Sequence, residues 1–201
     1  MRGRSGEGSL SASGTGLVAG RRMPGLDGFW VFVAGDLLIF TLLFVSFLDA
    51  RSDDIGGFDA ARHLLDPTHG GINTLLLLTS SWLVALASSA REDCRRARRL
   101  LAPGIVLGLG FVALKVYEYA HVLGLDPTQD QQPFLAYYFG ITGLHLAHVM
   151  IGCILLTVMW VRLPTLSAES RGFESVTCFW HLVDLLWLVI FPLLYLLRAA
   201  T

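Results

Sequence analysis

Long runs of apolar residues, separated by short polar segments, dominate this 201-residue chain. A helix needs roughly 20 mostly apolar residues to cross the ~30 Å hydrocarbon core of a bilayer. Five runs meet that length, at about 28–48, 71–90, 101–123, 136–162 and 174–198. Their polarity does not alternate as it would in barrel strands, and helices satisfy their own backbone hydrogen bonds in lipid. The pattern therefore predicts an all-α membrane protein, a bundle of five transmembrane helices.

The segment ahead of the first run differs in composition from the rest of the chain. Residues 1–26 are rich in Gly, Ser and Arg and contain no apolar stretch of the roughly 7–15 residues that a signal peptide requires. We therefore expect a disordered N-terminal tail, followed by one transmembrane domain over residues 27–201 with no internal repeat. Within the third run, Gly104 and Gly108 form a GxxxG spacing that favours close packing of helices.

The polar segments between the runs predict the loops. Residues 49–70 are acidic and polar and end near an Asp-Pro turn, and residues 124–133 form a second polar loop. Residues 91–99 are strongly basic and predict a short hairpin between the second and third helices. Pro192 lacks a backbone N–H, so it should interrupt the fifth helix near its end.

Composition and charge agree with a membrane protein. Hydrophobic residues make up 54% of the chain and charged residues 15%, whereas soluble domains carry roughly a quarter charged residues. The formal net charge of −1 gives no reason to expect nucleic-acid binding. The three cysteines have neither metal-type nor disulfide-type spacing. Eleven arginines fall in segments on the same side of the membrane as the amino terminus, and three fall in segments on the opposite side. This asymmetry predicts a cytoplasmic N-terminus and an external C-terminus.

Several ionisable side chains lie inside the predicted spans. An ionised group at the bilayer centre costs several kcal/mol unless it is paired or hydrated, so these side chains must face other helices. At ~1.5 Å per residue, four of them fall near the midplane and two nearer the outer face. The four are Asp36, His145, His148 and Asp184, the two are Lys115 and Glu118, and His181 completes the set.

Spacing groups six of these residues into three pairs. Residues three apart share a helix face, so each pair should point into the bundle together. Three interpretations remain open: polar clamps between helices, a proton-handling cluster, or a metal or haem site built on the two histidines. Haem ligands usually come from separate segments, and no further His-rich group supports such a site. The pairs are Lys115 with Glu118, His145 with His148, and His181 with Asp184.

Five segments, in order, resemble subunit III of the haem–copper oxidase family. The fourth run, YFGITGLHLAHVMIG, resembles that family's TGxHxxHVxxG segment. The fifth, FESVTCFWHLVDLLWLVIF, resembles its FE…WHxVDxxWL signature. The second run begins with Asn73-Thr74, the third contains Glu118-Tyr119, and Asp36 corresponds to the buried acid of the family's N-terminal span.

The chain also departs from the family pattern. The mitochondrial subunit has seven helices, and this chain resembles only the last five. Five-helix forms occur in bacteria, among them subunits of quinol oxidases and the accessory protein of nitric oxide reductase. Asp36 stands where the mitochondrial form has Glu, and Lys115 where Gln is usual. The segment PGLDGFWVFVAGDLLIF, which leads into the first helix, resembles the nitric-oxide-reductase accessory branch more than the core oxidase subunits.

The resemblance implies a non-catalytic subunit of a respiratory complex in the bacterial inner membrane. In this family the haems and copper reside in subunit I, while subunit III binds lipid, contacts subunit I, supports proton uptake and protects the complex during turnover. We therefore expect structural phospholipid, a haem-bearing partner subunit, and no catalytic, metal or cofactor-binding residue in this chain. The residues that carry the family pattern or lie buried with it are Asp36, Asn73, Lys115, Glu118, His145, His148, Glu174, His181 and Asp184.

A stand-alone proton-coupled transporter is the alternative from a different class of function. Buried His and carboxylate side chains also mark such transporters. Transporters usually contain internal repeats and broken helices around a midplane site. This chain has an odd number of predicted helices and no repeat, which favours the subunit interpretation.

Overall fold

The computed structural model describes residues 27–125, 128–165 and 171–197, and the part of the chain it describes is helical without a strand. Five of the described helices, α1, α3, α4, α5 and α6, are long and apolar enough to cross a membrane, which confirms the predicted fold class. The predicted disordered tail, residues 1–26, lies outside the described residues. The elements are α1 (Asp27–Asp53), α2 (Ile55–Arg62), α3 (Pro67–Ser89), α4 (Cys94–Leu123), η1 (Gln129–Gln131), α5 (Gln132–Arg162), η2 (Leu163–Thr165), α6 (Arg171–Phe191) and η3 (Pro192–Leu196).

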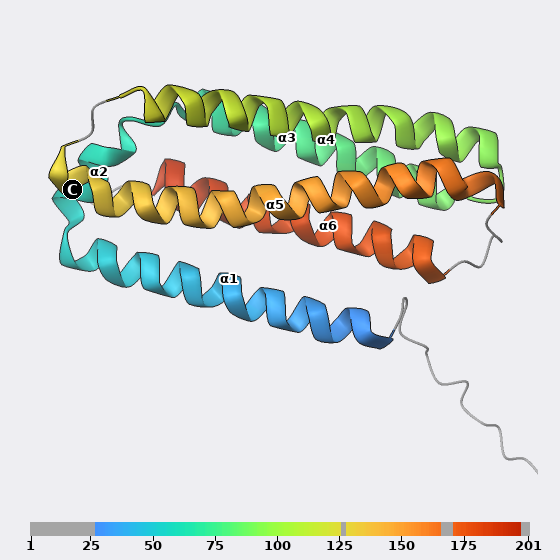
Figure 1. Ribbon diagram of the computed structural model, residues 1–201, viewed down its shortest axis with the longest axis horizontal. Coiled ribbons are helices and arrows are strands. Elements are labelled where there is room, and N and C mark those ends of the chain that lie inside the picture. The colour runs from blue at the N-terminus through green and yellow to red at the C-terminus, as the bar shows by residue number, and fades with distance from the viewer. Residues whose placement is uncertain (1–26, 126–127, 166–170, 198–201) are drawn as a thin grey trace, which may run out of the picture.

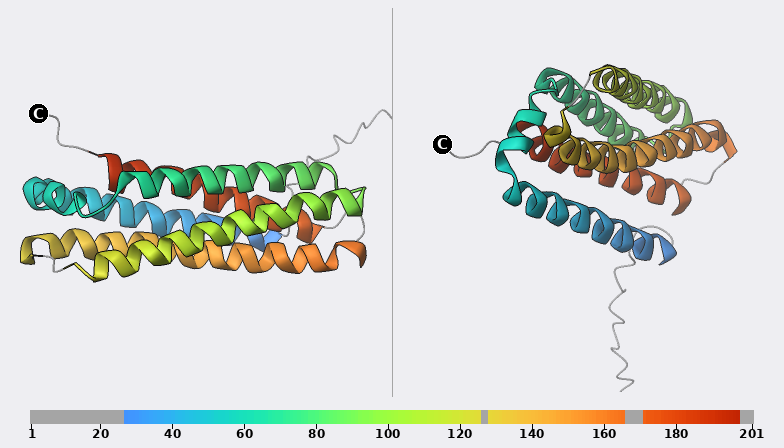
Figure 2. Two further views of the ribbon diagram at one scale, coloured as in Figure 1. Left: turned by 90° about the horizontal axis from the view of Figure 1, so that it is seen from above. Right: turned by 60° about the vertical axis from the view of Figure 1, so that its left-hand side comes forward.

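The five long helices run roughly along one axis (Figure 1). Helices α3, α4, α5 and α6 pack against one another, α3 on α4 and α6, and α5 on α4 and α6. Helix α1 lies at the edge of this group and contacts it mainly through α5 (Figure 2). The short α2 packs at one end of the bundle, against η1 and α5.

The eight-residue helix α2 lies in the segment that the sequence predicts as a loop, so that prediction is wrong there. The Asp54 side chain caps the helix by accepting a hydrogen bond from the Gly57 N–H at 2.9 Å. Phe58 and Ala61 are buried beneath the helix. Two glycines in eight residues weaken the helical pattern, and packing rather than propensity stabilises the segment.

Two aspartates set helix starts that the apolar pattern misses. The Thr68 N–H donates to Asp66 Oδ1 at 2.8 Å, which starts α3 at Pro67 and holds the pKa of the Asp66 carboxyl below its ordinary value. Asp93 Oδ1 accepts from the N–H groups of Arg95 and Arg96 at 3.1 Å and starts α4 at Cys94. The predicted basic hairpin is therefore wrong: residues 90–93 connect the helices, and residues 95–99 form the first turns of α4.

Pro192 ends the regular part of the last helix, as predicted. Helix α6 stops at Phe191, and a π-helical turn, η3, follows from Pro192. Such turns accommodate the backbone bond that proline cannot make. The Tyr195 carbonyl in η3 accepts a hydrogen bond from Arg62 Nη1 at 3.2 Å, so α2 is tied to the end of α6.

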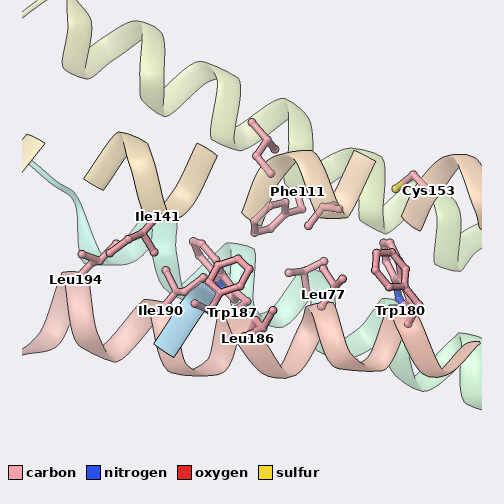
Figure 3. Close-up of a cluster of buried hydrophobic side chains, with 14 of the residues drawn as sticks. Leu77, Phe111, Ile141, Cys153, Trp180, Leu186, Trp187, Ile190 and Leu194 are labelled. Atoms are coloured by element: carbon pink, nitrogen blue, oxygen red, sulfur yellow. The ribbon is translucent and has the colours of Figure 1, made fainter. Parts of the chain in front are cut away.

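The two glycines of the GxxxG spacing permit close approach of α4 to its neighbours, as predicted. Ser80 Oγ of α3 donates to the Gly104 carbonyl at 2.7 Å. A Cβ on Gly108 would lie 2.7 Å from Cη2 of Trp180 and 2.9 Å from Sγ of Cys153, so α5 and α6 both press on this position. Figure 3 shows Trp180 and Cys153 within the apolar core.

Aromatic rings fill the centre of the bundle. Phe111 of α4 meets Trp187 of α6 edge to face, with ring centroids 4.9 Å apart (Figure 3). Trp180 and Trp187 are among the largest fully buried side chains in the described part of the protein. The polar groups described next are embedded in this apolar core.

Candidate functional site

Lys115 and Glu118 of α4 form a buried ion pair, 3.1 Å between Lys115 Nζ and Glu118 Oε2. Both are almost fully buried, at 0% and 3% exposure. Lys115 Nζ also donates to the hydroxyls of Tyr138 at 3.1 Å and Tyr195 at 2.6 Å. Tyr195 in turn donates to Glu118 Oε1 at 2.5 Å. We call these four residues the ion-pair cluster; the predicted pairing of Lys115 with Glu118 is confirmed.

Aromatic rings enclose the ammonium group of this cluster. Lys115 Nζ lies 4.7 Å from the ring centroid of Tyr138 and 5.2 Å from those of Tyr195 and Trp187. Ring faces attract a cation, most strongly where water is excluded. The three hydrogen bonds of Lys115 and the two oxygens engaged on Glu118 satisfy both charges. The cluster therefore joins α4, α5 and η3 by charge-balanced contacts.

A second buried pair joins α1 to α5. Asp36 Oδ1 lies 3.0 Å from His148 Nε2. The two residues are 5% and 8% exposed and lie deep in the apolar part of the bundle. The rings of Phe40 and Phe179 pack against His148, with centroids 5.7 Å and 6.2 Å away. The acid and the histidine that the sequence placed near the midplane are thus brought together from different helices.

The geometry indicates that one proton is shared between the two groups of this pair. His148 Nδ1 lies 2.8 Å from the Leu144 carbonyl, which can only accept, so Nδ1 carries a hydrogen. The bond between Nε2 and Asp36 Oδ1 then contains one proton. With the proton on Asp36 both groups are neutral, and with it on His148 they form an ion pair. In both states the pair is neutral overall, and losing that proton would leave a net negative charge in the apolar interior.

His145 does not join His148 in a paired site. Its ring stacks on Trp187 at 5.3 Å and meets the edge of Phe111 at 5.7 Å. The residue is fully buried, and neither ring nitrogen has a hydrogen-bond partner among the residues that the structure describes. Asn73 is likewise fully buried, and within the same part of the chain both its amide atoms lack a partner. Within the described residues no three His, Cys, Asp or Glu side chains are grouped as metal ligands.

His181 and Asp184 do not bond to each other, so the predicted couple is wrong. His181 Nδ1 lies 2.5 Å from the hydroxyl of Ser81 on α3, and the Asp184 carboxyl interacts with the same serine. Asp184 is 5% exposed, and its Oδ1 has no hydrogen-bond partner in the described part of the chain. Ser81 therefore connects α3 to α6 at this level.

Glu174 lies at one end of the bundle, away from the buried pairs. Its Oε1 accepts from Arg91 Nη1 at 2.8 Å, and both side chains are about one-third exposed. This ion pair ties the connection between α3 and α4 to the start of α6. Exposed ion pairs contribute little stability, so Glu174 fixes position more than it adds energy.

Sequence reasoning missed the hydroxyl partners of the buried charges. Tyr138, Tyr195 and Ser81 resemble ordinary packing residues in an apolar run, and their partners lie far away in sequence. A weak signal was available: a buried Tyr usually finds a hydrogen-bond partner, and Lys115 needs more acceptors than Glu118 provides.

The chain is similar to known proteins along most of its length. The family model described as cytochrome c oxidase subunit III matches residues 7–198. The cytochrome c oxidase subunit 3 of Bacillus subtilis (strain 168) is 31% identical over 183 residues, covering 85% of this chain and 84% of that protein. The cytochrome bo(3) ubiquinol oxidase subunit 3 of Pseudomonas putida is 28% identical over 176 residues, which again cover 85% of this chain and 84% of that protein. The probable cytochrome c oxidase subunit 3 of Rickettsia prowazekii is 31% identical over 195 residues, covering 86% of this chain and 68% of that protein.

Proposed function

The chain belongs to the cytochrome c oxidase subunit III family, a non-catalytic component of haem–copper oxidases, and from that membership we propose that it binds the haem-bearing catalytic subunit of such a complex. The match of the family model over residues 7–198 is the observation that carries the proposal. The relatives are oxidase subunits and give no support to a stand-alone transporter. They do not test the similarity to the nitric-oxide-reductase accessory branch, which stays a prediction.

The Asp36–His148 pair is suited to a chemical role in such a complex. A single shared proton between a carboxylate and an imidazole can move between the two groups without changing the net charge. We propose that the pair supports proton uptake by the catalytic subunit and slows its inactivation during turnover. The ion-pair cluster, by contrast, has both charges fully satisfied and serves to hold α4, α5 and η3 together.

The helices and the arginines support a membrane location and an orientation for the subunit. Five apolar helices and bacterial oxidase relatives support a multi-pass protein of the bacterial inner membrane. The excess of arginines on the amino-terminal side supports an orientation with the N-terminus in the cytoplasm and the C-terminus outside. We further propose that the chain carries structural phospholipid and that haem and copper are bound only by the partner subunit.

Substitution of Asp36 by Asn tests the proton role. The Asn amide can donate to His148 Nε2 in place of the acid, so the contact between α1 and α5 and the assembly of the complex should survive. The shared proton that moves between carboxylate and imidazole is lost. We expect the complex that carries Asp36→Asn to be made in normal amounts but to lose activity faster during turnover than wild type.

Asp36→Leu serves as the structural control, because it removes the hydrogen bond and leaves the His148 ring nitrogen buried without a partner. Activity is followed against time in the purified complex for wild type and both variants. Identical time courses for wild type and Asp36→Asn, with failure of assembly confined to Asp36→Leu, would reduce Asp36 to a packing role.

A further inference from the structure

We propose that the groove between α4 and α5 holds an acyl chain of an anionic phospholipid, whose phosphate is bound by Arg98 and Arg162. Helices α4 and α5 lie side by side and antiparallel (Figures 1 and 2). Arg98 therefore lies near the start of α4 and Arg162 at the end of α5, at the same end of the bundle. The inference rests on the proposal that the chain carries structural phospholipid, and it names the binding site and the charge of the head group.

The groove is an open cavity of about 390 Å³ with an almost wholly apolar lining. Leu109 of α4 and Ile154 of α5 stand on its two walls and are 52% and 62% exposed. The hydroxyl of Thr157 is occupied, because it donates to the Cys153 carbonyl at 2.7 Å. Such a groove offers dispersion contacts to a hydrocarbon chain and no free polar group for water.

Each wall of the groove continues along its helix face to an arginine. On α5, Met150, Ile154 and Val158 follow one another at four-residue intervals, and Arg162 is the next position. On α4, Leu109 lies eleven residues after Arg98, which is three turns along the same face. The lining of the apolar groove and the two cations therefore lie on the same side of α4 and α5.

Contacts at the end of the bundle fix the length of the groove. The Trp160 ring of α5 donates through Nε1 to the Arg98 carbonyl at 3.1 Å, so these two residues lie at one level. Val158 lies two residues from this level along α5, and Val112 lies fourteen residues from it along α4. At ~1.5 Å per residue, the groove therefore extends ~18 Å from the level of Val158 to the level of Val112. A single leaflet contributes about half of the ~30 Å hydrocarbon core, so one acyl chain fits this length.

The two arginines are available to an anion. The Arg98 guanidinium lies over the Trp160 ring, 4.3 Å from its centroid, which holds it at the end of the groove. Neither Arg98 nor Arg162 forms an ion pair with any described carboxylate, whereas Arg51 and Arg91 each have one. Arg98 Nε is buried and has no hydrogen-bond partner among residues 27–125, 128–165 and 171–197. A lipid phosphate supplies the missing acceptor, and guanidinium groups bind phosphate oxygens in a bidentate manner.

Lipid add-back to the purified complex tests the site. The complex is stripped of lipid in detergent, titrated with phosphatidylglycerol or phosphatidylcholine, and bound lipid is counted by native mass spectrometry. We expect wild type to prefer phosphatidylglycerol. Each arginine near an anionic surface contributes about fivefold in affinity, so the double variant Arg98→Gln/Arg162→Gln should bind it about 25-fold more weakly. Arg96→Gln is the matched control, since its exposed side chain lies on the other side of α4.

A second pair of variants examines the groove itself. Ile154→Trp fills it, and should weaken binding of both lipids while the preference for phosphatidylglycerol remains. Ile39→Trp places the same ring on the exposed face of α1, where 51% of the isoleucine is exposed, and should change nothing. Size-exclusion profiles identify any variant that fails to fold.

Three outcomes would overturn the lipid site. These are equal binding of the two lipids by wild type, an equal loss in Arg96→Gln, and unchanged lipid binding in Ile154→Trp accompanied by loss of the catalytic subunit. The last outcome would make the groove a protein interface. The haem content of the wild-type sample tests the proposed function separately, because absence of a haem-bearing partner would refute that proposal and leave the lipid titration valid.

Discussion

Removal of Lys115 should destabilise the protein strongly, because its partner would stay buried. In Lys115→Met the carboxylate of Glu118 loses its cation in a site that is 3% exposed. Its charge is then left in the apolar interior without a counter-charge. Removing one partner of a buried ion pair typically costs roughly 3–5 kcal/mol. We expect a loss of this size.

The double variant separates the pair from the packing around it. Glu118→Gln alone leaves the ammonium without a counter-charge and should cost about as much, roughly 3–5 kcal/mol. Lys115→Met/Glu118→Gln removes both charges together, so its cost should be about 1–2 kcal/mol, far below the sum of the single variants. Arg95→Met, an exposed cation on the same helix, should stay within about 0.5 kcal/mol of wild type.

Unfolding in mixed micelles of increasing SDS content measures these differences. Tryptophan fluorescence reports the transition, because the Trp187 ring lies 5.2 Å from Lys115 Nζ. The reasoning fails if Lys115→Met is as stable as Arg95→Met. It also fails if the two single costs simply add in the double variant, since additive costs would mean that the charges do not interact.

Three further predictions concern topology, metal binding and packing. A reporter that works only outside the cytoplasm, fused after Thr201, should be active; activity of a cytoplasmic reporter there would reverse the orientation. The chain purified without partners should show no Soret band and no stoichiometric copper, and metal that disappears in His145→Ala would contradict this. Gly108→Ala should cost about 1–3 kcal/mol in the SDS assay, because its Cβ meets Trp180. Gly110→Ala should be nearly neutral, because the nearest atom to its Cβ belongs to Leu76, 3.7 Å away. Equal effects of the two substitutions would refute the close packing at Gly108.

The fold could be predicted from the sequence because lipid constrains it so strongly. Apolar runs of about twenty residues leave the backbone few alternatives to a spanning helix. All five predicted spans are helices in the structure. The helix starts were displaced because the residues that set them, Asp66 and Asp93, are polar and lie outside the apolar runs. Helix α2 was missed because only eight residues with two glycines form it, and its stability depends on contacts with α5 and η1.

The candidate site was predictable only where its partners are local. Lys115 and Glu118 are three residues apart on one helix, so the spacing alone indicated their contact. Asp36 and His148 come from α1 and α5, and their pairing depends on how those helices pack. His181 and Asp184 have the same spacing as Lys115 and Glu118, yet Ser81 of a neighbouring helix takes the bond. Spacing identifies a shared face, and tertiary packing then selects the partner.

Co-purification of a haem-bearing subunit with this chain is the most direct test of its assignment as a subunit III. The full chain, tagged and expressed in its own membrane, is purified in mild detergent, and its absorbance spectrum and polypeptides are recorded. The eluate should show a Soret band and one catalytic subunit per chain, and the haem should stay with that partner when the two are separated. A chain that elutes without a haem protein, or that retains the haem itself after separation, would contradict the account.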